Sequence, residues 1–533
     1  MQRILVTDPL SELGLAKLHE AADMEVVLRV GASHAELLEL IPEFDALLVR
    51  SQTKVSADVF QAGKRLRVVG RAGVGVDNID VRAATKAGVL VINAPDGNTI
   101  TTAEFTFGMM QSLARHLPQA HQSLREGRWE RTKFVGVELR KKTLGIVGLG
   151  RIGAEVAQRA QAFDMQVVAY DPFLTPARAE KIGVKAASLH DTIRHADFIT
   201  VHTPLIKETH HILGDAEFAI MKRGVRVLNC ARGGIIDESA LRKALDDGIV
   251  AGAALDVYEE EPPHGNPLLE YPQVIATPHL GASTVEAQVN VAVDVADGVV
   301  QILRGGAYPH TVNLPPLPQE LREVLEPYTE MGEVLGSLAS QLMRGAVQKV
   351  HLQYEGEPAQ YIVDPITRSA LKGVLAHHYE DEVHLISAAL VAEEMGVEVV
   401  ESKVPKGGSH GNRVRIVLHG FDGAQVSAAG TYIRGLGMRV VEIDGFPVDI
   451  TPTAAMLITW HRDRPGIIGR AGSVLGLAGV NIASMQVGRR QEGGQAVMIL
   501  AVDRPVSDES VTAIRDAVGM DRVVYIELPL EDE

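Results

Sequence analysis

The part of the sequence that decides the fold is Thr143-Leu144-Gly145-Ile146-Val147-Gly148-Leu149-Gly150-Arg151-Ile152-Gly153. Its apolar start predicts a β-strand, and three glycines in the spacing G-x-G-x-x-G then open a helical pattern that runs to residue 162. Gly148 would permit a tight turn, Gly150 the close approach of a phosphate, and Gly153 close packing of helix on strand. The N-terminus of that helix offers N–H donors and positive potential. The stretch therefore predicts a βαβ unit that binds a dinucleotide.

The next predicted strand, residues 166–170, is followed directly by Asp171, 18 residues after Gly153. A carboxylate at this position accepts hydrogen bonds from the ribose hydroxyls and repels a 2′-phosphate. The two features together predict NAD rather than NADP as the cofactor. The alternative is a glycine-rich turn followed by a surface aspartate that binds nothing.

Short apolar runs alternate with helical patterns on both sides of this stretch. Helices between successive strands are typical of parallel sheets. The second run therefore predicts a doubly wound α/β sheet of the Rossmann type, and the first run a flavodoxin-like sheet. We expect a helix at residues 285–303 to return to the first sheet. The predicted strands are residues 4–6, 26–28, 46–49, 68–69 and 89–92 in the first run, and 143–147, 166–170, 198–202, 226–229, 251–255 and 274–276 in the second.

The chain has 533 residues, which is enough for three or four domains at about 150 residues each. Residues 309–318 and 447–453 contain prolines that disfavour regular elements, and they are predicted to be linkers. The last elements follow the order βαββαβ, which is typical of a ferredoxin-like fold. The predicted domains are a substrate-binding domain at 1–96 completed by 284–311, a dinucleotide-binding domain at 97–283, an α/β domain at 315–448 and a ferredoxin-like domain at 454–533.

The formal net charge of −16 argues against nucleic acid or an anionic membrane as a partner. No apolar run reaches the roughly 18 residues that cross a bilayer. The single cysteine, Cys230, cannot form an intramolecular disulfide, which fits a reducing compartment. We therefore expect a soluble cytoplasmic protein in which local arginines attract any anionic substrate.

Three residues at predicted strand ends on one edge of the second sheet suggest hydride transfer from a 2-hydroxy acid. Arg232 can bind a carboxylate with two hydrogen bonds. His279 can take the hydroxyl proton, and Glu261 can orient the imidazole and stabilise its cation. Each residue alone also has a structural explanation, such as a surface ion pair, and only their shared position favours the catalytic interpretation.

The first domain offers a second cationic group of residues. Arg50 and Ser51 follow one predicted strand, Arg71 follows another, and Asn98 lies in the loop that crosses to the second domain. Two arginines with a hydroxyl and an amide could bind a phosphate despite the acidic chain. The alternative is that these arginines pair with acidic neighbours such as Asp77.

The order of these motifs resembles the D-2-hydroxyacid dehydrogenase family. The motifs are the glycine-rich turn, Asp171, Cys-Ala-Arg-Gly-Gly, Asp-Val-x-x-x-Glu-Pro and Pro-His-Leu-Gly-Ala. The resemblance implies an NAD-dependent oxidoreductase with Arg232, Glu261 and His279 as its catalytic residues, and no metal. It further implies cofactor contacts from Val74, Gly148, Gly150, Arg151, Ile152, Gly153, Asp171, His202, Thr203, Cys230, Ala231, Asp256, Gly281 and Ala282. Cys230 would then form part of the cofactor pocket rather than act as a nucleophile.

Within the family, the chain is most similar to the long members that carry a middle domain and a terminal regulatory domain. This resemblance implies 3-phosphoglycerate and 3-phosphohydroxypyruvate as substrate and product, with substrate contacts from Arg50, Ser51, Arg71 and Asn98. It also implies a homo-oligomer, a dimer of dimers, with basic residues of segment 128–133 reaching across an interface. The rival interpretations are a dehydrogenase acting on 2-oxoglutarate or glyoxylate, and a regulator that senses NADH or serine without turnover.

The ferredoxin-like domain resembles an ACT domain, a module that often binds amino acids between paired copies. By this resemblance L-serine is the expected effector, with Asp463 and Asn481 as contacts, and the alternative is a dimerisation module. In the middle domain, Lys403, Lys406 and Arg413 are candidate contacts for an anion.

Overall fold

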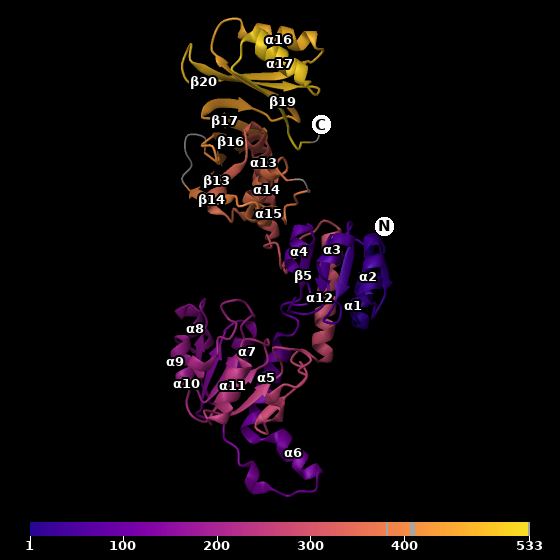
Figure 1. The fold of residues 1–533 in the computed structure, drawn as a ribbon, viewed down its shortest axis with the longest axis vertical. Coiled ribbons are helices and arrows are strands. Elements are labelled where there is room, and N and C mark those ends of the chain that lie inside the picture. The colour runs from indigo at the N-terminus through magenta and orange to yellow at the C-terminus, as the bar shows by residue number, and fades with distance from the viewer. Residues whose placement is uncertain (380–381, 406–410, 531–533) are drawn as a thin grey trace.

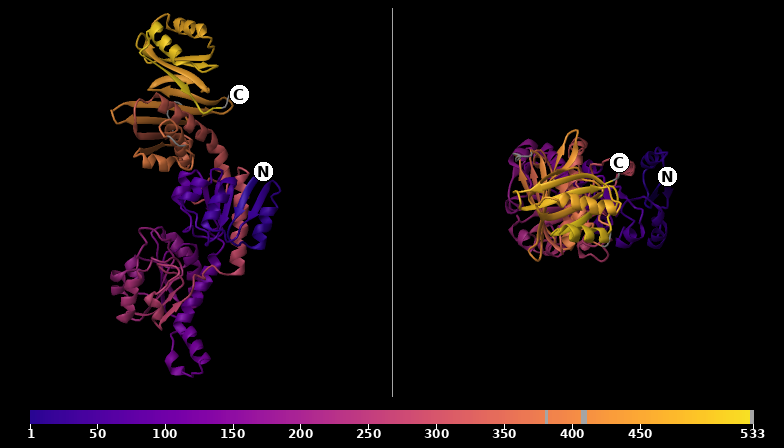
Figure 2. Two further views of the ribbon diagram at one scale, coloured as in Figure 1. Left: turned by 45° about the vertical axis from the view of Figure 1, so that its right-hand side comes forward. Right: turned by 90° about the horizontal axis from the view of Figure 1, so that it is seen from above.

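The computed structural model describes residues 1–379, 382–405 and 411–530, which form four β-sheets with their helices. We call these sheets with their helices the first, second, third and fourth units, in chain order. Figures 1 and 2 show an elongated molecule. The fourth and third units lie at one end, the first unit lies in the middle, and helix α6 projects from the second unit at the other end. Within the described residues, no helix is both long enough and apolar enough to cross a membrane.

The first unit is a five-stranded parallel sheet in the order β2-β1-β3-β4-β5, which confirms the flavodoxin-like prediction. Helix α12 (Val285–Leu303) returns to it, as predicted, and buries Val291, Val295 and Val299 in its core. Gly14 allows this packing, because a Cβ there would lie 2.6 Å from the Cβ of Ala292. The strands are β1 (Gln2–Val6), β2 (Met24–Leu28), β3 (Ala46–Val49), β4 (Val68–Arg71) and β5 (Leu90–Asn93), and the other helices are α1 (Glu12–His19), α2 (His34–Leu40), α3 (Ala57–Ala62) and α4 (Val81–Lys86).

The second unit is a seven-stranded parallel sheet in the order β12-β11-β10-β9-β6-β7-β8, with a hydrophobic core on each face. The order reverses between β6 and β9, which places a ligand site at the carboxyl ends of those strands. The strands are β6 (Thr143–Val147), β7 (Gln166–Tyr170), β8 (Lys185–Ala186), β9 (Phe198–Val201), β10 (Val225–Asn229), β11 (Val250–Leu255) and β12 (Val274–Ala276). The helices are α5 (Thr99–Arg115), α6 (Leu117–Arg125), α7 (Arg151–Ala162), α8 (Pro176–Ile182), α9 (Leu189–Arg194), α10 (Asp215–Ile220) and α11 (Glu238–Asp246).

The proline-rich segment after α12 is bound to the edge of the first sheet. Thr311 forms an antiparallel bridge with Ile92 of β5, and the backbone N–H of Val312 donates to the carbonyl oxygen of Val91. The side chain of Asn313 makes three more hydrogen bonds, two of them to backbone groups of Val89 and Val91. This linker is therefore anchored along the edge of the first sheet.

The third unit is a mixed six-stranded sheet in the order β14-β13-β15-β16-β17-β18, with a buried pair of helices. The two helices, α13 and α14, cross closely because a Cβ at Gly336 would overlap the carbonyl oxygen of Ala370. The strands are β13 (Val347–Glu355), β14 (Glu398–Val404), β15 (Arg413–Gly420), β16 (Gln425–Ile433), β17 (Gly437–Ile443) and β18 (Phe446–Ile450), and the helices are α13 (Gln319–Leu342), α14 (Asp364–Leu375) and α15 (Ala388–Glu394).

The predicted linker at residues 447–453 is wrong for most of its length, because β18 occupies Phe446–Ile450. Pro447 is tolerated there since β18 is the edge strand of its sheet, where a missing N–H breaks no ladder. β18 also packs against β20 of the fourth unit, and a Cβ at Gly488 would overlap the carbonyl oxygen of Pro447. The third and fourth units therefore form a continuous body.

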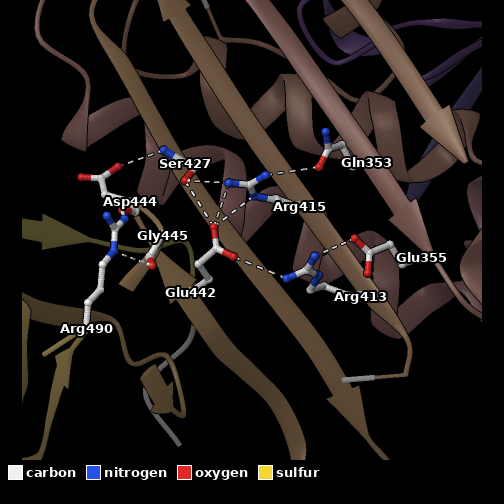
Figure 3. A network of polar contacts seen from close by, with 9 residues as sticks. All are labelled: Gln353, Glu355, Arg413, Arg415, Ser427, Glu442, Asp444, Gly445 and Arg490. Carbon is white, nitrogen blue, oxygen red and sulfur yellow. Dashed lines mark hydrogen bonds and ion pairs between the residues drawn. The ribbon is translucent and has the colours of Figure 1, made fainter. Parts of the chain in front are cut away.

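The fourth unit has the predicted βαββαβ order, with its sheet arranged β20-β21-β19-β22. Residues of this sheet, including Ile458 and Ile499, belong to the same hydrophobic cluster as the core of the third unit. Arg490 adds hydrogen bonds to the carbonyl oxygens of Asp444 and Gly445 (Figure 3). The elements are β19 (Ala455–Arg462), α16 (Ile467–Leu477), β20 (Ile482–Arg489), β21 (Gln495–Val502), α17 (Asp508–Val518) and β22 (Arg522–Glu527).

Candidate active site

The glycine-rich turn between β6 and α7 has the geometry that its sequence predicts. Gly148 has a φ of +96°, and a Cβ there would lie 2.7 Å from the carbonyl oxygen of His202. A Cβ at Gly150 would meet no atom within 4 Å, so this position faces open space. A Cβ at Gly153 would overlap the carbonyl oxygen of Gly148, which shows how closely α7 packs on the turn. The turn thus combines a backbone conformation that favours glycine, an open face and close packing.

Asp171 lies at the end of β7, beside this turn. One oxygen of its carboxylate accepts the backbone N–H of Leu149 at 2.9 Å, and the other accepts that of Phe173 at 2.8 Å. These bonds fix the carboxylate at the position where the ribose of a bound dinucleotide is expected.

A cavity of about 500 Å³ lies between the carboxyl ends of the second unit's strands and the first unit. Four buried polar atoms of residues in its wall lack a hydrogen-bond partner in the described part of the chain: Asn98 Oδ1, Thr99 Oγ1, His202 Nδ1 and Thr203 Oγ1. Because buried polar atoms are almost always paired, a ligand in this cavity would satisfy them. The wall brings together the predicted residues Val74, Asn98, Arg151, Ile152, His202, Thr203, Cys230, Ala231, Arg232, Asp256, His279, Gly281 and Ala282.

His279 and Glu261 form a hydrogen-bonded pair, with Nδ1 of His279 lying 2.8 Å from Oε2 of Glu261. An ionised carboxylate only accepts, so Nδ1 donates and Nε2 remains available to a substrate. His279 has a left-handed backbone with φ of +55°, and its N–H donates to the carbonyl oxygen of Asp256 at 2.9 Å. Such strain in a residue other than glycine is typical of functional sites.

Burial works to raise the pKa of Glu261. The hydrogen bond from His279 and the positive charges of His279 and Arg232 outweigh burial and hold this pKa below its usual value. Glu261 is therefore ionised at neutral pH and can stabilise an imidazolium at His279.

Arg232 lies at the boundary of the first and second units. Its Nε is 3.2 Å from Oδ2 of Asp77 in the first unit, and its Nη1 donates to the carbonyl oxygen of Ala231 at 2.7 Å. A Cβ at Gly75 would overlap Nη2 of Arg232, so glycine is required there for this placement. The guanidinium is thus held in the cavity that His279 also lines.

Cys230 and His202 in the cavity wall are buried, and burial keeps both side chains neutral. Burial and the charge of Asp256 raise the pKa of the Cys230 thiol to about 12, which argues against a nucleophile. Burial lowers the pKa of His202 to about 4, so its ring is neutral. The carboxylate of Asp256 accepts the backbone N–H groups of Leu280 and Gly281 at 2.7 and 2.8 Å, and so fixes the segment that carries His279.

The predicted phosphate contacts come from the ends of β3 and β4 and from the loop before α5. Arg71 is mostly buried, and burial lowers its pKa to about 10. The positive charges of Arg232 and Arg50 also lower this pKa, whereas the negative charge of Asp77 raises it. The positive charges of Arg50 and Arg232 therefore both act on the guanidinium of Arg71. Among the described residues, the cavity wall includes Asn98 but not Arg50, Ser51 or Arg71, and Ser51 is exposed.

Three residues with clear contacts here were not predicted as site residues from the sequence. Asp77 was considered only as an ion-pair partner for Arg50 or Arg71, and the structure pairs it with Arg232 instead. Asn78 bonds to Arg71 and to the Arg50 loop, and Asp8 is buried beneath the same loop. The position of Asp8, shortly after the end of β1, is the signal that could have identified it.

The predicted effector residues lie at one end of the fourth unit. Asp463 follows β19, and its carboxylate accepts a hydrogen bond from Nη1 of Arg489 at 2.8 Å, which lowers the pKa of Asp463. Asn481 precedes β20 on an exposed loop, and its backbone N–H donates to Asp503. Both side chains lie near the surface of the single chain.

Two of the three basic residues considered in the third unit have internal partners. Lys403 donates to the carbonyl oxygen of Tyr361, and Arg413 bonds to Glu355 and Glu442 (Figure 3). Lys406 lies outside the described residues. These contacts do not favour Lys403 or Arg413 as anion ligands.

Comparison with family models identifies three regions of the chain. Residues 107–281 match the NAD binding domain of the D-isomer specific 2-hydroxyacid dehydrogenases, residues 324–444 match the D-3-phosphoglycerate dehydrogenase intervening domain, and residues 455–519 match the ACT domain. These matches fall in the second, third and fourth units, respectively.

Full-length relatives and solved structures agree with these matches. The chain is 48% identical to D-3-phosphoglycerate dehydrogenase of Bacillus subtilis over 99% of this chain and 100% of that protein. It is 44% identical to the protein of the same name from Methanocaldococcus jannaschii, with the same coverage. Among solved structures, the D-lactate dehydrogenase of Aquifex aeolicus, complexed with NAD and lactic acid, has a TM-score of 0.53, 26% identity and coverage of 58% of this chain and 99% of that one.

A glyoxylate reductase from Paecilomyes thermophila has a TM-score of 0.54 and 29% identity, and the match covers 60% of this chain and 99% of that one. The two solved structures thus match little more than half of the chain, whereas the named relatives match almost all of it. The sequence-based recognition is therefore confirmed: the chain belongs to the D-3-phosphoglycerate dehydrogenase family.

Proposed function

We propose that this protein oxidises the C2 hydroxyl of 3-phospho-D-glycerate to give 3-phosphohydroxypyruvate, with NAD as the oxidant. This reaction is the first step of phosphorylated L-serine biosynthesis. The observation that carries the proposal is a single cavity lined by Arg232 and by His279, which is hydrogen-bonded to Glu261. The first unit also lines this cavity and contains Arg50 and Arg71, which Asn78 joins by hydrogen bonds. A substrate with a carboxylate at one end and a phosphate at the other would match these cations at both ends.

The residues of the cavity fit NAD. Gly150 leaves open space at the start of α7, where N–H donors and the helix dipole favour a pyrophosphate, and Asp171 lies where a ribose would follow. The unpaired polar atoms at Asn98, Thr99 and Thr203 would find partners on the cofactor or substrate. When bound, NAD accepts the hydride that leaves C2.

The chain's own residues would bind the substrate and move its proton. Arg232 would exchange its contact with Asp77 for the substrate carboxylate, held by two hydrogen bonds. Nε2 of His279 would accept the proton of the C2 hydroxyl as the carbonyl forms, and Glu261 would stabilise the resulting imidazolium. In the reverse direction the same imidazolium would return the proton to the carbonyl oxygen.

The alternative functions account for fewer of these contacts. Glyoxylate has no second anionic group, so a dehydrogenase specific for it would not need both Arg50 and Arg71. 2-Oxoglutarate has a second carboxylate in place of the phosphate, so comparing the two substrates decides between them. A regulator without turnover would not need the complete set of Arg232, Glu261 and His279.

We propose further that the ACT domain binds L-serine and inhibits the enzyme. Asp463 lies in the turn between β19 and α16, and its carboxylate could bind an ammonium group in place of Arg489. Asn481 lies on the loop that enters β20 and could contact either end of an amino acid.

Assembly into a dimer of dimers in the cytoplasm is also part of this proposal. Helix α6 and the segment after it project from the second unit (Figure 1) and expose Leu124, Trp129 and Val135. Large exposed apolar side chains on a projecting arm are typical of a surface that another chain covers. Of the basic residues expected to cross the interface, Arg128 pairs within its own arm with Glu126 and Glu130.

The decisive measurement is NADH consumption with 3-phosphohydroxypyruvate, with and without L-serine. Turnover that L-serine slows would support both the enzyme and the regulatory role of the ACT domain. Turnover that is indifferent to L-serine would keep the enzyme and leave the ACT domain with a role in assembly. Binding of NADH without turnover would contradict the proposed reaction and favour another oxo acid or a sensor.

A further inference from the structure

The loop that carries Arg50 is held from below by a buried carboxylate. Asp8 is 1% exposed and accepts the backbone N–H groups of Arg50 at 2.6 Å, Gln52 at 3.1 Å and Thr53 at 3.2 Å. The hydroxyl of Thr53 donates to the same carboxylate at 2.5 Å. A buried carboxylate satisfied by successive N–H groups fixes the backbone between them. Asp8 therefore sets the conformation of residues 50–53.

The same loop is held from its other side by Asn78. The side-chain Nδ2 of Asn78 donates to the carbonyl oxygens of Arg50 at 2.8 Å and of Thr53 at 2.6 Å. Its Oδ1 accepts a hydrogen bond from Nε of Arg71 at 2.6 Å. These three bonds require two N–H donors and one acceptor in the same side chain. Among side chains of this size, the carboxamide of asparagine provides all three. One side chain thus connects the two arginines.

These bonds also decide which edge of Arg71 faces a ligand. Because Nε is used by Asn78, the two Nη groups form the edge of the guanidinium that makes no hydrogen bond to the described residues. Nη1 lies against Gly73, where a Cβ would approach to 2.5 Å, so a side chain at that position would displace it. An edge of two Nη groups is suited to binding two oxygens of a phosphate at once.

We propose that Asn78, supported by Asp8, is a positioning residue that fixes Arg50 relative to Arg71 and thereby makes the enzyme select a phosphorylated substrate. The inference rests on the proposed function. Arg232 and His279 serve the carboxylate and hydroxyl that every 2-hydroxy acid carries. The spacing of Arg50 and Arg71 matters only to a substrate with a second anionic group at the far end.

The test compares 3-phosphohydroxypyruvate with hydroxypyruvate, which is the same oxo acid without its phosphate. The kcat and KM of NADH-dependent reduction are measured for both substrates with wild type and Asn78→Ala. We expect the ratio of kcat/KM values, phosphorylated over unphosphorylated, to fall by about 10- to 100-fold, mainly through KM of the phosphorylated substrate. An equal loss on both substrates, or an unchanged ratio, would overturn the proposal.

Asn313→Ala is the matched control. Asn313 is an asparagine at the same sheet, and its side chain also makes three hydrogen bonds, but these join the linker to β5 and to Thr85. The ratio should therefore keep its wild-type value in this variant. A ratio that falls equally in Asn313→Ala would show a general effect on the sheet and would contradict a specific role for Asn78.

Asn78→Asp keeps the size and the acceptor for Arg71 and loses both donors to the Arg50 loop, so it serves if Asn78→Ala does not fold. Its ratio should also fall, and a wild-type ratio would overturn the proposal. The proposed function and the role of Asn78 are contradicted by different results. Wild type without a preference for the phosphorylated substrate would contradict the proposed function. A strong wild-type preference that survives both substitutions would contradict only the role of Asn78.

Discussion

The catalytic cavity and the effector turn are two proposed ligand sites built in opposite ways. The cavity lies between two sheets, and its wall has buried polar atoms that find no partner among the described residues. His279 in this wall bonds to Glu261. The turn at Asp463 lies at the surface, and its carboxylate is already paired with Arg489 in the same chain. In the cavity, the pair of His279 and Glu261 is thus formed before a ligand binds, and only Arg232 would exchange a partner, Asp77, for the substrate. At the turn, the carboxylate proposed to bind the ligand must itself give up Arg489.

This difference lies in how much of each proposed site one chain encloses. Parallel strands bring their carboxyl ends to one edge, so the segments after β10 and β12 place Arg232 and His279 in one cavity, and the segment after β11 places Glu261 against His279. Of the proposed effector residues, Asn481 is exposed and Asp463 is partly exposed, so the single chain leaves both accessible to solvent.

The largest effect is expected from Glu261→Gln. This substitution tests whether the pair of Glu261 and His279, which is formed within one chain, acts in catalysis. Replacing the carboxylate removes the charge that stabilises the imidazolium of His279, so kcat should fall by about 10²-fold or more. The wild-type pKa of Glu261 lies below its usual value, so its charge is present at neutral pH and is lost only as pH falls through that lowered pKa. In the variant, the acid limb of the oxidation profile and the alkaline limb of the reduction profile should both move to lower pH. Initial rates measured across pH check both limbs.

Glu259→Gln is the matched control for this experiment. Glu259 belongs to the same acidic run but bonds to His211 and to the backbone of Glu238, away from the catalytic pair. Its pH profile should match that of wild type. A Glu261→Gln enzyme with the wild-type kcat and pH profile would contradict the assignment of Glu261.

The glycine-rich turn gives a smaller effect that separates folding from binding. Gly148→Ala places a side chain at φ of +96° and against the carbonyl oxygen of His202, so it should lower both the melting temperature and the affinity for NADH. Gly150→Ala adds a methyl group to open space at a φ of −72°, so the melting temperature should stay at the wild-type value. The methyl group should weaken the binding of NADH by about tenfold, because the pyrophosphate approaches the backbone there. Thermal unfolding and fluorescence titration measure the two quantities. Equal NADH affinity in Gly150→Ala and wild type would place the pyrophosphate elsewhere.

The fold could be predicted from the sequence wherever a pattern is local. The alternation of apolar runs and helices gave both parallel sheets, and the motif at Gly148 located the strand order reversal. The segment at residues 447–453 was mispredicted because proline content does not distinguish a linker from an edge strand such as β18. The packing of that strand on β20 involves the far end of the sequence, which no local pattern reveals.

The candidate site divides in the same way. Residues at strand ends, such as Arg232 and His279, could be identified because topology alone brings them together. Asp8 and Asn78 could not, because their role depends on hydrogen bonds across 42 and 28 residues of sequence to Arg50. The partner of Asp463 escaped prediction for the same reason, since Arg489 lies 26 residues further along the chain, at the end of β20.

The smallest effect is expected at Asp463, and it bears directly on the comparison. This carboxylate is already bonded to Arg489 and is screened by solvent. Losing its contact with the ligand in Asp463→Ala should therefore weaken the binding of L-serine by only about fivefold. Calorimetric titration of wild type, Asp463→Ala and the surface control Asp516→Ala measures the affinities, and the control should match wild type. Equal heats and affinities in all three proteins would remove Asp463 from the effector site. A loss far above fivefold would instead mean that a second copy encloses this carboxylate and excludes water, so that the effector site, like the catalytic cavity, is buried once it is complete.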